Sequence, residues 1–385
     1  TAYIPALLGI ENTLQQPYAE YWLGAHSSNP SIVQWKQNKG IALNELIKEA
    51  AGEWLGEKVA RQFGELPYLF KVLDVKDMLS IQVHPSKAEA EKGFARENEA
   101  GIPLNAPHRN YKDANHKPEV MLALSEFWLL HGFKEKNLLL QTLQQTEAFK
   151  ILLPAFEKEG YYGLYKQVME LPQATVDSML KPLLHKSEPL YKANQLSKSD
   201  PAYWACKTIT SNGGNYTGID RGIFSIYFFN IVQLHPGQAI FQGAGVPHAY
   251  LEGQNIELMS NSDHVLRGGL TPKHIDVAEL LKHTLFEGIV PQIMNGEKNG
   301  AETIYHCPVP DFEVSKIELD KKAIYHHTAS SAEIILLTEG EAHIICNEQT
   351  LHIKKGEAVI ASANELYNIS SSSRAVLYKA GVATR

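Results

Sequence analysis

Short apolar runs bounded by turn residues occupy two long stretches of the chain. In the first stretch, which spans about residues 66–130, the strand-like runs cover residues 66–73, 78–84 and 119–124. A single helix is expected within it, beginning after Ser86 as a possible N-cap. In the second stretch, from about Tyr305 to the end, short alternating strands follow one another, with Gly340 and Gly356 at turns. This pattern predicts two strand-rich units, the second a small β-barrel or jelly roll.

The segment between them has a different period. After Lys136, apolar residues recur at spacings near three and four until about Trp204, which predicts a helical insertion. Strands are expected to return at residues 226–234 and to continue through residue 259, before one helix around Asp276. We therefore expect a mainly β protein with a helical insertion. Its expected domains are a discontinuous β domain (residues 1–135 and 205–292), the insertion (136–204) and a C-terminal β domain (293–385).

Length and composition narrow the function. A chain of 385 residues exceeds a single hydrophobic core, and its 44% hydrophobic and 21% charged residues are ordinary for a globular protein. The net charge of −7 and the absence of a basic stripe argue against nucleic acid and anionic membranes as partners. No signal peptide or membrane span is evident, and three widely spaced cysteines fit neither disulfides nor a thiolate zinc site. A cytoplasmic protein acting on a small molecule is expected.

Polar residues alternate with apolar ones along residues 80–84. On a strand, Ser80, Gln82 and His84 would share one face. Taken alone, such a face is more often simply exposed to water. Glu119 begins another apolar run and His248 follows a glycine-proline turn, and each alone is more often a surface charge or a structural histidine.

Together these residues supply two imidazoles, one carboxylate and one amide oxygen. This donor set suits a borderline divalent ion such as Zn²⁺, with one position left for water or substrate, although glutamine is an uncommon zinc ligand. Residues 257–274 add further ionisable groups. Arg267 and Lys273 among them are able to meet a phosphate or a developing enediolate, or else to form surface salt bridges. No phosphate-binding GxxxxGK[ST] loop, GxGxxG fingerprint, GxSxG elbow or CxxC pair occurs.

At this point the sequence resembles a known family, the type I phosphomannose isomerases, over nearly its whole length. The resemblance rests on six blocks in the family's order, and these blocks are Pro17–His26, Leu66–Leu73, Leu79–Lys87, Asn115–Glu119, Gly245–Tyr250 and Ser262–Lys273. It implies a zinc-dependent aldose–ketose isomerase that interconverts mannose 6-phosphate and fructose 6-phosphate. It also implies two cupin-type jelly-roll domains plus an α-helical domain, with no metal site in the second cupin.

The resemblance also implies roles for individual residues. Gln82, His84, Glu119 and His248 would bind one zinc ion per chain, and Arg267 would be catalytic. The chain departs from the family in three places: it lacks an opening strand with a Tyr-Ala-Trp-Gly motif, and it has His264 and Ser86 where Asn and Asp are common. The first departure would fit a trimmed N-terminus. The second would change the pH dependence near the site.

Isomerisation through an enediol needs a proton moved between C2 and C1 and the enediol oxygens stabilised. We expect Glu257 to move the proton, with Lys117 as the other candidate. We expect Ser80, Lys87 and Lys273 to contact the substrate phosphate. Two alternatives stay open: another cupin enzyme, such as an iron-dependent oxygenase or a different sugar-phosphate isomerase, and a metal- and sugar-binding protein without turnover. The sequence carries no signal for assembly, and a monomer is expected.

Overall fold

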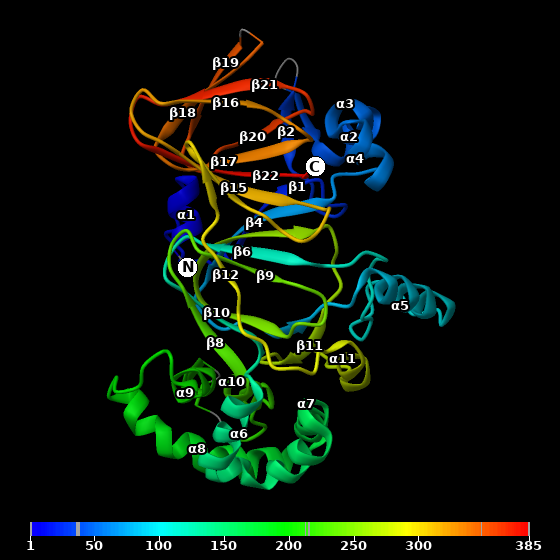
Figure 1. Ribbon diagram of the computed structural model, residues 1–385, viewed down its shortest axis with the longest axis vertical. Helices are drawn as coiled ribbons and strands as arrows, with labels where there is room; N and C mark the ends of the chain where they lie inside the picture. The colour runs from blue at the N-terminus through cyan, green and yellow to red at the C-terminus, as the bar shows by residue number, and fades with distance from the viewer. Residues whose placement is uncertain (1, 36–38, 212, 215, 348, 384–385) are drawn as a thin grey trace.

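Two β units and a group of helices lie one after another along the long axis of the molecule (Figure 1). The computed structural model describes residues 2–35, 39–211, 213–214, 216–347 and 349–383. The second β unit lies at one end, the first β unit in the middle and a layer of helices at the other end. The expected mainly β organisation with an inserted helical segment is confirmed. No helix within these ranges is long and apolar enough to span a bilayer.

The first β unit is built around one long strand. Its strands are β1 (Glu20–Gly24), β4 (Tyr68–Val75), β5 (Ile81–Val83), β6 (Glu119–Ala123), β7 (Phe127–Phe133), β8 (Phe229–Leu234), β9 (Ala239–Gln242), β10 (His248–Ser260), β11 (Leu266–Gly269) and β12 (Ile293–Met294). The first residues of β10 pair with β5 and β7, and its later residues pair with β4 and β6. Strand β10 therefore joins both faces of the unit, and alternate residues along it point into the interior.

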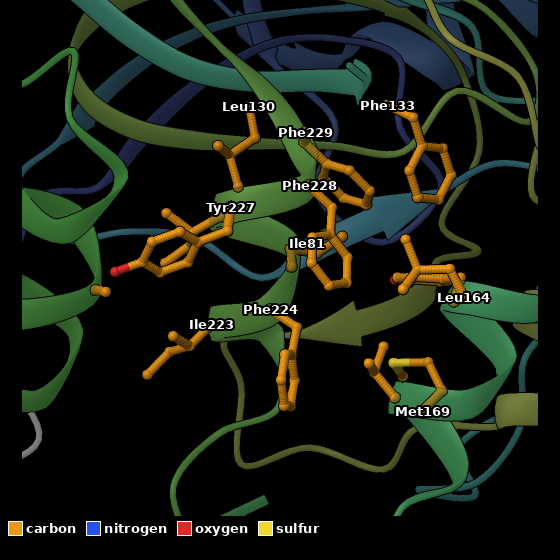
Figure 2. Close-up of a cluster of buried hydrophobic side chains, with 14 of the residues drawn as sticks. Ile81, Leu130, Phe133, Leu164, Met169, Ile223, Phe224, Tyr227, Phe228 and Phe229 are labelled. Atoms are coloured by element: carbon orange, nitrogen blue, oxygen red, sulfur yellow. The ribbon is translucent and has the colours of Figure 1, made fainter. Parts of the chain in front are cut away.

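Helices cover one end of the first β unit. They are α6 (Lys136–Gln145), the 3₁₀ helix η1 (Glu147–Leu152), α7 (Leu153–Glu170), α8 (Gln173–Lys192), α9 (Pro201–Ser211) and α10 (Gly222–Phe228). Figure 2 shows the buried cluster that joins them to the sheet, in which Phe133 and Phe229 meet Leu164 and Phe228. The ring centroids of Phe133 and Phe229 lie 4.8 Å apart in an edge-to-face contact.

The prediction of strand at Ile226 was wrong. Residues Ile226–Phe228 end helix α10, and strand β8 begins only at Phe229. Every residue of α10 is buried, so its apolar run has no polar face to reveal a helical period. The helices also continue past Trp204, where the sequence suggested that they end, because α9 runs to Ser211 and α10 follows it.

The second β unit packs against the first. Its strands are β13 (Glu297–Asn299), β14 (Glu302–Tyr305), β15 (Glu313–Leu319), β16 (Ile324–Thr328), β17 (Glu333–Glu339), β18 (Glu341–Cys346), β19 (Gln349–Lys354), β20 (Ala358–Ala361), β21 (Leu366–Ser370) and β22 (Ala375–Gly381). A shared apolar cluster joins this unit to β4, β6 and β10. Within it, the Tyr68 hydroxyl lies 3.0 Å from the carbonyl oxygens of Ala332 and Ala380.

The remaining elements lie around the two β units. They are α1 (Tyr3–Leu8), β2 (Ile32–Trp35), β3 (Lys39–Ala42), α2 (Leu43–Glu49), α3 (Ala51–Leu55), α4 (Glu57–Phe63), α5 (Lys87–Glu99) and α11 (Val277–His283). Helix α5 begins after Ser86, as predicted, although the Ser86 side chain makes no capping hydrogen bond. Helix α11 is capped by Asp276, whose carboxylate accepts a hydrogen bond from the Glu279 N–H. Both helices lie on the same side of the first β unit, and α11 lies beside β11 (Figure 1).

Candidate active site

A row of polar side chains crosses the face of the sheet that contains β5. Gln82 of β5 lies opposite His248 of β10 on one side and opposite Arg267 of β11 on the other. His248 in turn lies opposite His131 of β7. Residues that are directly opposite one another project to the same face, so strand pairing gathers this row from four separate parts of the chain.

His84, Glu119 and His248 form a compact buried group. One potential ligand atom from each lies within 4.8 Å of the other two. Nε2 of His84 is 3.3 Å from one Glu119 carboxylate oxygen, and Nε2 of His248 is 3.2 Å from the other. Glu119 is the first residue of β6, where pairing with β10 and β9 fixes the direction of its side chain.

The donor atoms of this group fit a divalent ion. Although the two Nε2 atoms lie near Glu119, neither forms a well-aligned hydrogen bond, and Oε1 of buried Gln82 has no partner within the described residues. Unpaired buried polar atoms are costly, so this group of potential ligand atoms is suited to bind a cation. Nδ1 of His248 lies 2.9 Å from the Val246 carbonyl oxygen, which leaves its Nε2 for a metal.

The charges around the group keep its ligands deprotonated. Burial alone would raise the pKa of Glu119, but Lys117 and His84 hold it well below its usual value. Nζ of Lys117 lies 2.8 Å from the Glu119 carboxylate. Burial, with a further contribution from Lys117, lowers the pKa of His84 to about 3. Neutral imidazole and ionised carboxylate are the forms that bind metals.

A second ion pair lies beside the group and was missed by the sequence analysis. Nζ of Lys71 on β4 is 3.1 Å from the carboxylate of Glu257 on β10 and 3.9 Å from that of Glu20 on β1. Burial alone would lower the pKa of Lys71, but Glu257, Glu20 and Glu119 together raise it. The signal was present: a lysine interrupts the otherwise apolar strand around it, which marks a charge that must be buried with a partner.

These side chains line one cavity of about 200 Å³. Five of the ten predicted site residues are among its lining residues, and these five are Gln82, Lys117, Glu119, His248 and Glu257. Glu20, Trp22 and Lys71 line the same cavity from β1 and β4. His84 is not a lining residue, but it belongs to the buried group whose other two members, Glu119 and His248, line the cavity.

The other four predicted residues lie around this cavity and not in its lining. Arg267 is half-buried next to Gln82 and makes no hydrogen bond or ion pair with a described residue; burial lowers its pKa. Ser80 is half-buried immediately before β5. Lys87 and Lys273 are exposed, and Nζ of Lys87 donates to Oδ1 of Asn115 at 2.8 Å. Their assignment to the substrate stays a prediction.

The chain matches two family models. The one described as the type I phosphomannose isomerase catalytic domain matches residues 3–136, and the one described as the mannose-6-phosphate isomerase cupin domain matches residues 301–377. The mannose-6-phosphate isomerase of Salmonella typhimurium is 39% identical over 93% of this chain and 90% of its own length. That of Rattus norvegicus is 34% identical over 94% of this chain and 89% of its own.

Solved structures are similar over almost the full chain. The mannose 6-phosphate isomerase of Salmonella typhimurium, crystallised with fructose 6-phosphate and zinc, has a TM-score of 0.86 at 36% identity, covering 98% of this chain and 94% of that one. A zinc-bound holo form of mannose 6-phosphate isomerase also has a TM-score of 0.86 at 36% identity, and it covers 99% of this chain and 96% of its own.

Two β units, with a buried His–Glu–His group inside the first, define an enzyme of the cupin class. Within that class the comparisons are decisive, because two family models and relatives above 30% identity agree over most of the chain. The chain belongs to the type I phosphomannose isomerase family, and it is an isomerase. The resemblance seen in the sequence is thus confirmed.

Proposed function

We propose that this isomerase interconverts mannose 6-phosphate and fructose 6-phosphate through an enediol intermediate. The observation that carries the proposal is the convergence of His84, Glu119 and His248 on one point of a cavity that also contains the Lys71–Glu257 ion pair. The fructose 6-phosphate and zinc in the Salmonella typhimurium structure support the same substrate and the same metal for this chain.

We propose that one zinc ion is held by Gln82, His84, Glu119 and His248. The unpaired Gln82 oxygen and the two Nε2 atoms support this ligand set. When bound, zinc supplies Lewis-acid polarisation of substrate oxygen. Lys117 contributes a second positive charge 2.8 Å from Glu119, so its ammonium offsets the buried carboxylate of the site.

Glu257 is the preferred proton carrier. Its carboxylate is buried in the cavity and is held in place by the Lys71 ammonium at 3.1 Å. Its two oxygens also allow one group to serve both C1 and C2. Lys117, the other candidate, lies 2.8 Å from the proposed metal ligand Glu119 and has a single nitrogen to serve both carbons, which makes it the weaker choice.

Arg267 is proposed to stabilise the negative oxygen of the enediolate, because it lies opposite Gln82 in the β5–β11 pairing and has no carboxylate partner in the described chain. Ser80 and Lys87 bracket β5 and are proposed as phosphate contacts, together with Lys273 beyond β11. All three positions belong to segments adjoining the strands that carry Gln82 and Arg267. A sugar phosphate bound to the metal group would extend its far end toward these segments.

We also propose that the domain division expected from the sequence applies: residues 1–135 with 205–292, residues 136–204, and residues 293–385. Separate clusters of buried apolar residues within the first and the second β unit support the division between those two, while the helices share their cluster with the first unit. Cytoplasmic localisation and a monomeric state remain predictions from the sequence.

The test is a coupled assay for mannose 6-phosphate isomerisation with purified protein, before chelation, after chelation and after zinc is restored. We expect turnover to disappear with the metal and to return with zinc. Glu257→Gln should abolish turnover while zinc binding persists, and Glu252→Gln, on the same strand but outside the cavity lining, serves as the matched control. Zinc-loaded, folded protein without turnover would refute the proposal.

A further inference from the structure

Apart from the two Nε2 atoms of the metal group and Nδ1 of His131, two buried imidazole nitrogens near the metal group have no hydrogen-bond partner among the described residues. One is Nδ1 of His84, the ring nitrogen that faces away from Glu119, and the other is Nε2 of His264. His264 follows β10 and is 1% exposed. The centroids of the two rings lie 6.5 Å apart at an interplanar angle of 59°. Because unsatisfied buried nitrogens are rare in native proteins, a neighbouring pair calls for an explanation.

Hydrogen bonds on the other side of His264 determine its tautomer. The Ser262 hydroxyl donates to Oδ1 of Asp113 at 2.9 Å, so its only proton is already used. Ser262 Oγ also lies 3.0 Å from Nδ1 of His264, and that contact is a hydrogen bond only if Nδ1 carries the proton. Asp113 additionally accepts the backbone N–H groups of Asn115 and Asp263, which keeps it a carboxylate acceptor. In neutral His264, Nε2 therefore carries a lone pair and is an acceptor.

His84 presents a hydrogen-bond donor where His264 presents an acceptor. Its Nε2 lies 3.3 Å from Glu119 within the proposed metal group, so when that nitrogen binds the metal the proton of the neutral ring lies on Nδ1 and needs an acceptor. A metal-binding histidine almost always donates its other ring N–H to an outer group, which fixes the ring and raises its basicity. His248 has such an acceptor in the Val246 carbonyl oxygen. For His84, the unpaired donor and the unpaired acceptor of His264 are complementary.

We propose that His264 is a positioning residue for the metal ligand His84, with its Nε2 accepting, through one bound water, the hydrogen bond that His84 Nδ1–H donates. The inference rests on the proposed metal site. A direct bond would require about 3 Å between the nitrogens, and none is formed. One buried water satisfies both groups and is a common bridge at such separations. Asp113, Ser262 and His264 then form a chain of hydrogen bonds that ends at His84.

The first test is the zinc dissociation constant, measured by competition with a chromogenic chelator. His264→Leu removes the acceptor and should weaken zinc binding about 10- to 100-fold. His264→Gln retains an acceptor oxygen and should restore affinity to within about threefold of the wild type. His283→Leu is the matched control, because His283 is another buried histidine that contacts Tyr111 but not His84, and its zinc affinity should not change.

Wild-type affinity in folded His264→Leu would overturn the inference, as would equal losses in the Leu and Gln variants. If the Leu variant does not fold, ¹⁵N-histidine NMR of the metal-free wild-type protein decides the question. The inference predicts that His264 carries its proton on Nδ1 at neutral pH, and a proton on Nε2 would refute it. Failure of the wild-type chain to bind zinc at all would instead refute the proposed function, so the two failures are distinguishable.

Discussion

Replacing Lys379 should destabilise the second β unit without touching the candidate active site. Nζ of Lys379 on β22 lies 2.9 Å from the Glu302 carboxylate, 3.0 Å from the Tyr325 hydroxyl and 3.1 Å from Nε2 of His327. Glu333 lies 3.9 Å away and also binds His327 and the Tyr367 hydroxyl. The lysine and both glutamates are buried, so this ammonium offsets two carboxylates in the interior.

The expected loss of stability follows from the groups that remain after Lys379 is replaced. Lys379→Met leaves buried carboxylates without their cation, and breaking one side of a buried ion pair costs about 3–5 kcal/mol. In the wild type, burial raises the pKa of Glu302, but Lys379 more than reverses this and the pKa is lowered. A lowered folded-state pKa stabilises the protein above the unfolded value, and that stability is lost as pH falls through the folded value. In the variant the Ser315 and Tyr325 hydroxyls still donate to Glu302 but the charge of Lys379 is lost, so the deficit in stability should be largest at neutral pH and should shrink toward pH 4.

The assay must report on the second β unit alone. All five tryptophans lie at or before Trp204, and Trp54 packs in the cluster that the two β units share, so tryptophan fluorescence does not report on the second unit alone. Hydrogen exchange followed by mass spectrometry of peptides from β15 and β22 measures its opening directly. Exposed Lys355→Met is the matched control. Adding Glu302→Gln to Lys379→Met should recover about 1–3 kcal/mol. Unchanged exchange in Lys379→Met, or no recovery in the double variant, would refute the reasoning.

Three further predictions concern the first β unit and the helices. Arg267→Ala should lower turnover about 10²- to 10³-fold with zinc content unchanged, as measured by metal analysis beside the coupled assay; loss of zinc in parallel would contradict its assigned role. Chelation should lower the thermal midpoint of unfolding. If free zinc was 1,000 times its dissociation constant before chelation, the lost stability is about 4 kcal/mol. His84→Ala should abolish this difference between the zinc-loaded and the chelated protein. Phe133→Ala, in the fully buried cluster of Figure 2, should cost about 3–5 kcal/mol in urea unfolding; a loss under 1 kcal/mol would show that the cluster repacks.

The sequence predicted strands with one wet face and also the fully buried strands β4 and β6, but it failed at the fully buried helix α10. Strands of the second β unit alternate clearly, and β15 alternates buried with more exposed positions along most of its length. Helix α10 is buried on all sides, so neither a period of two nor one of 3.6 could appear in it, and it was taken for strand. Its helical state is decided by packing against η1 and α9, a tertiary effect that local patterns do not contain.

The site was predicted in part for a related reason. Gln82 and His84 stand two residues apart, so alternation alone placed them on one face. Glu119 and His248 are far apart in sequence, and they come together only because β10 pairs with both β5 and β6. Lys71 was overlooked although it stands in a run of apolar residues, because its partner Glu257 is identified only when β10 is placed beside β4.

The two β units hold buried carboxylates in chemically different ways, and the difference bears on why only one of them is expected to bind metal. In the second unit, one flexible ammonium satisfies Glu302 directly and lies between it and Glu333, and hydroxyl groups complete their hydrogen bonds. That interior has no surplus donor atoms aimed at a common point within the described residues. In the first unit, Lys117 satisfies only one Glu119 oxygen, and the two Nε2 atoms and the Gln82 oxygen stay unpaired. Unpaired buried polar atoms are costly, so binding a cation would stabilise the first unit. In the second unit a lysine already satisfies the buried carboxylates, so a cation would bring no comparable gain.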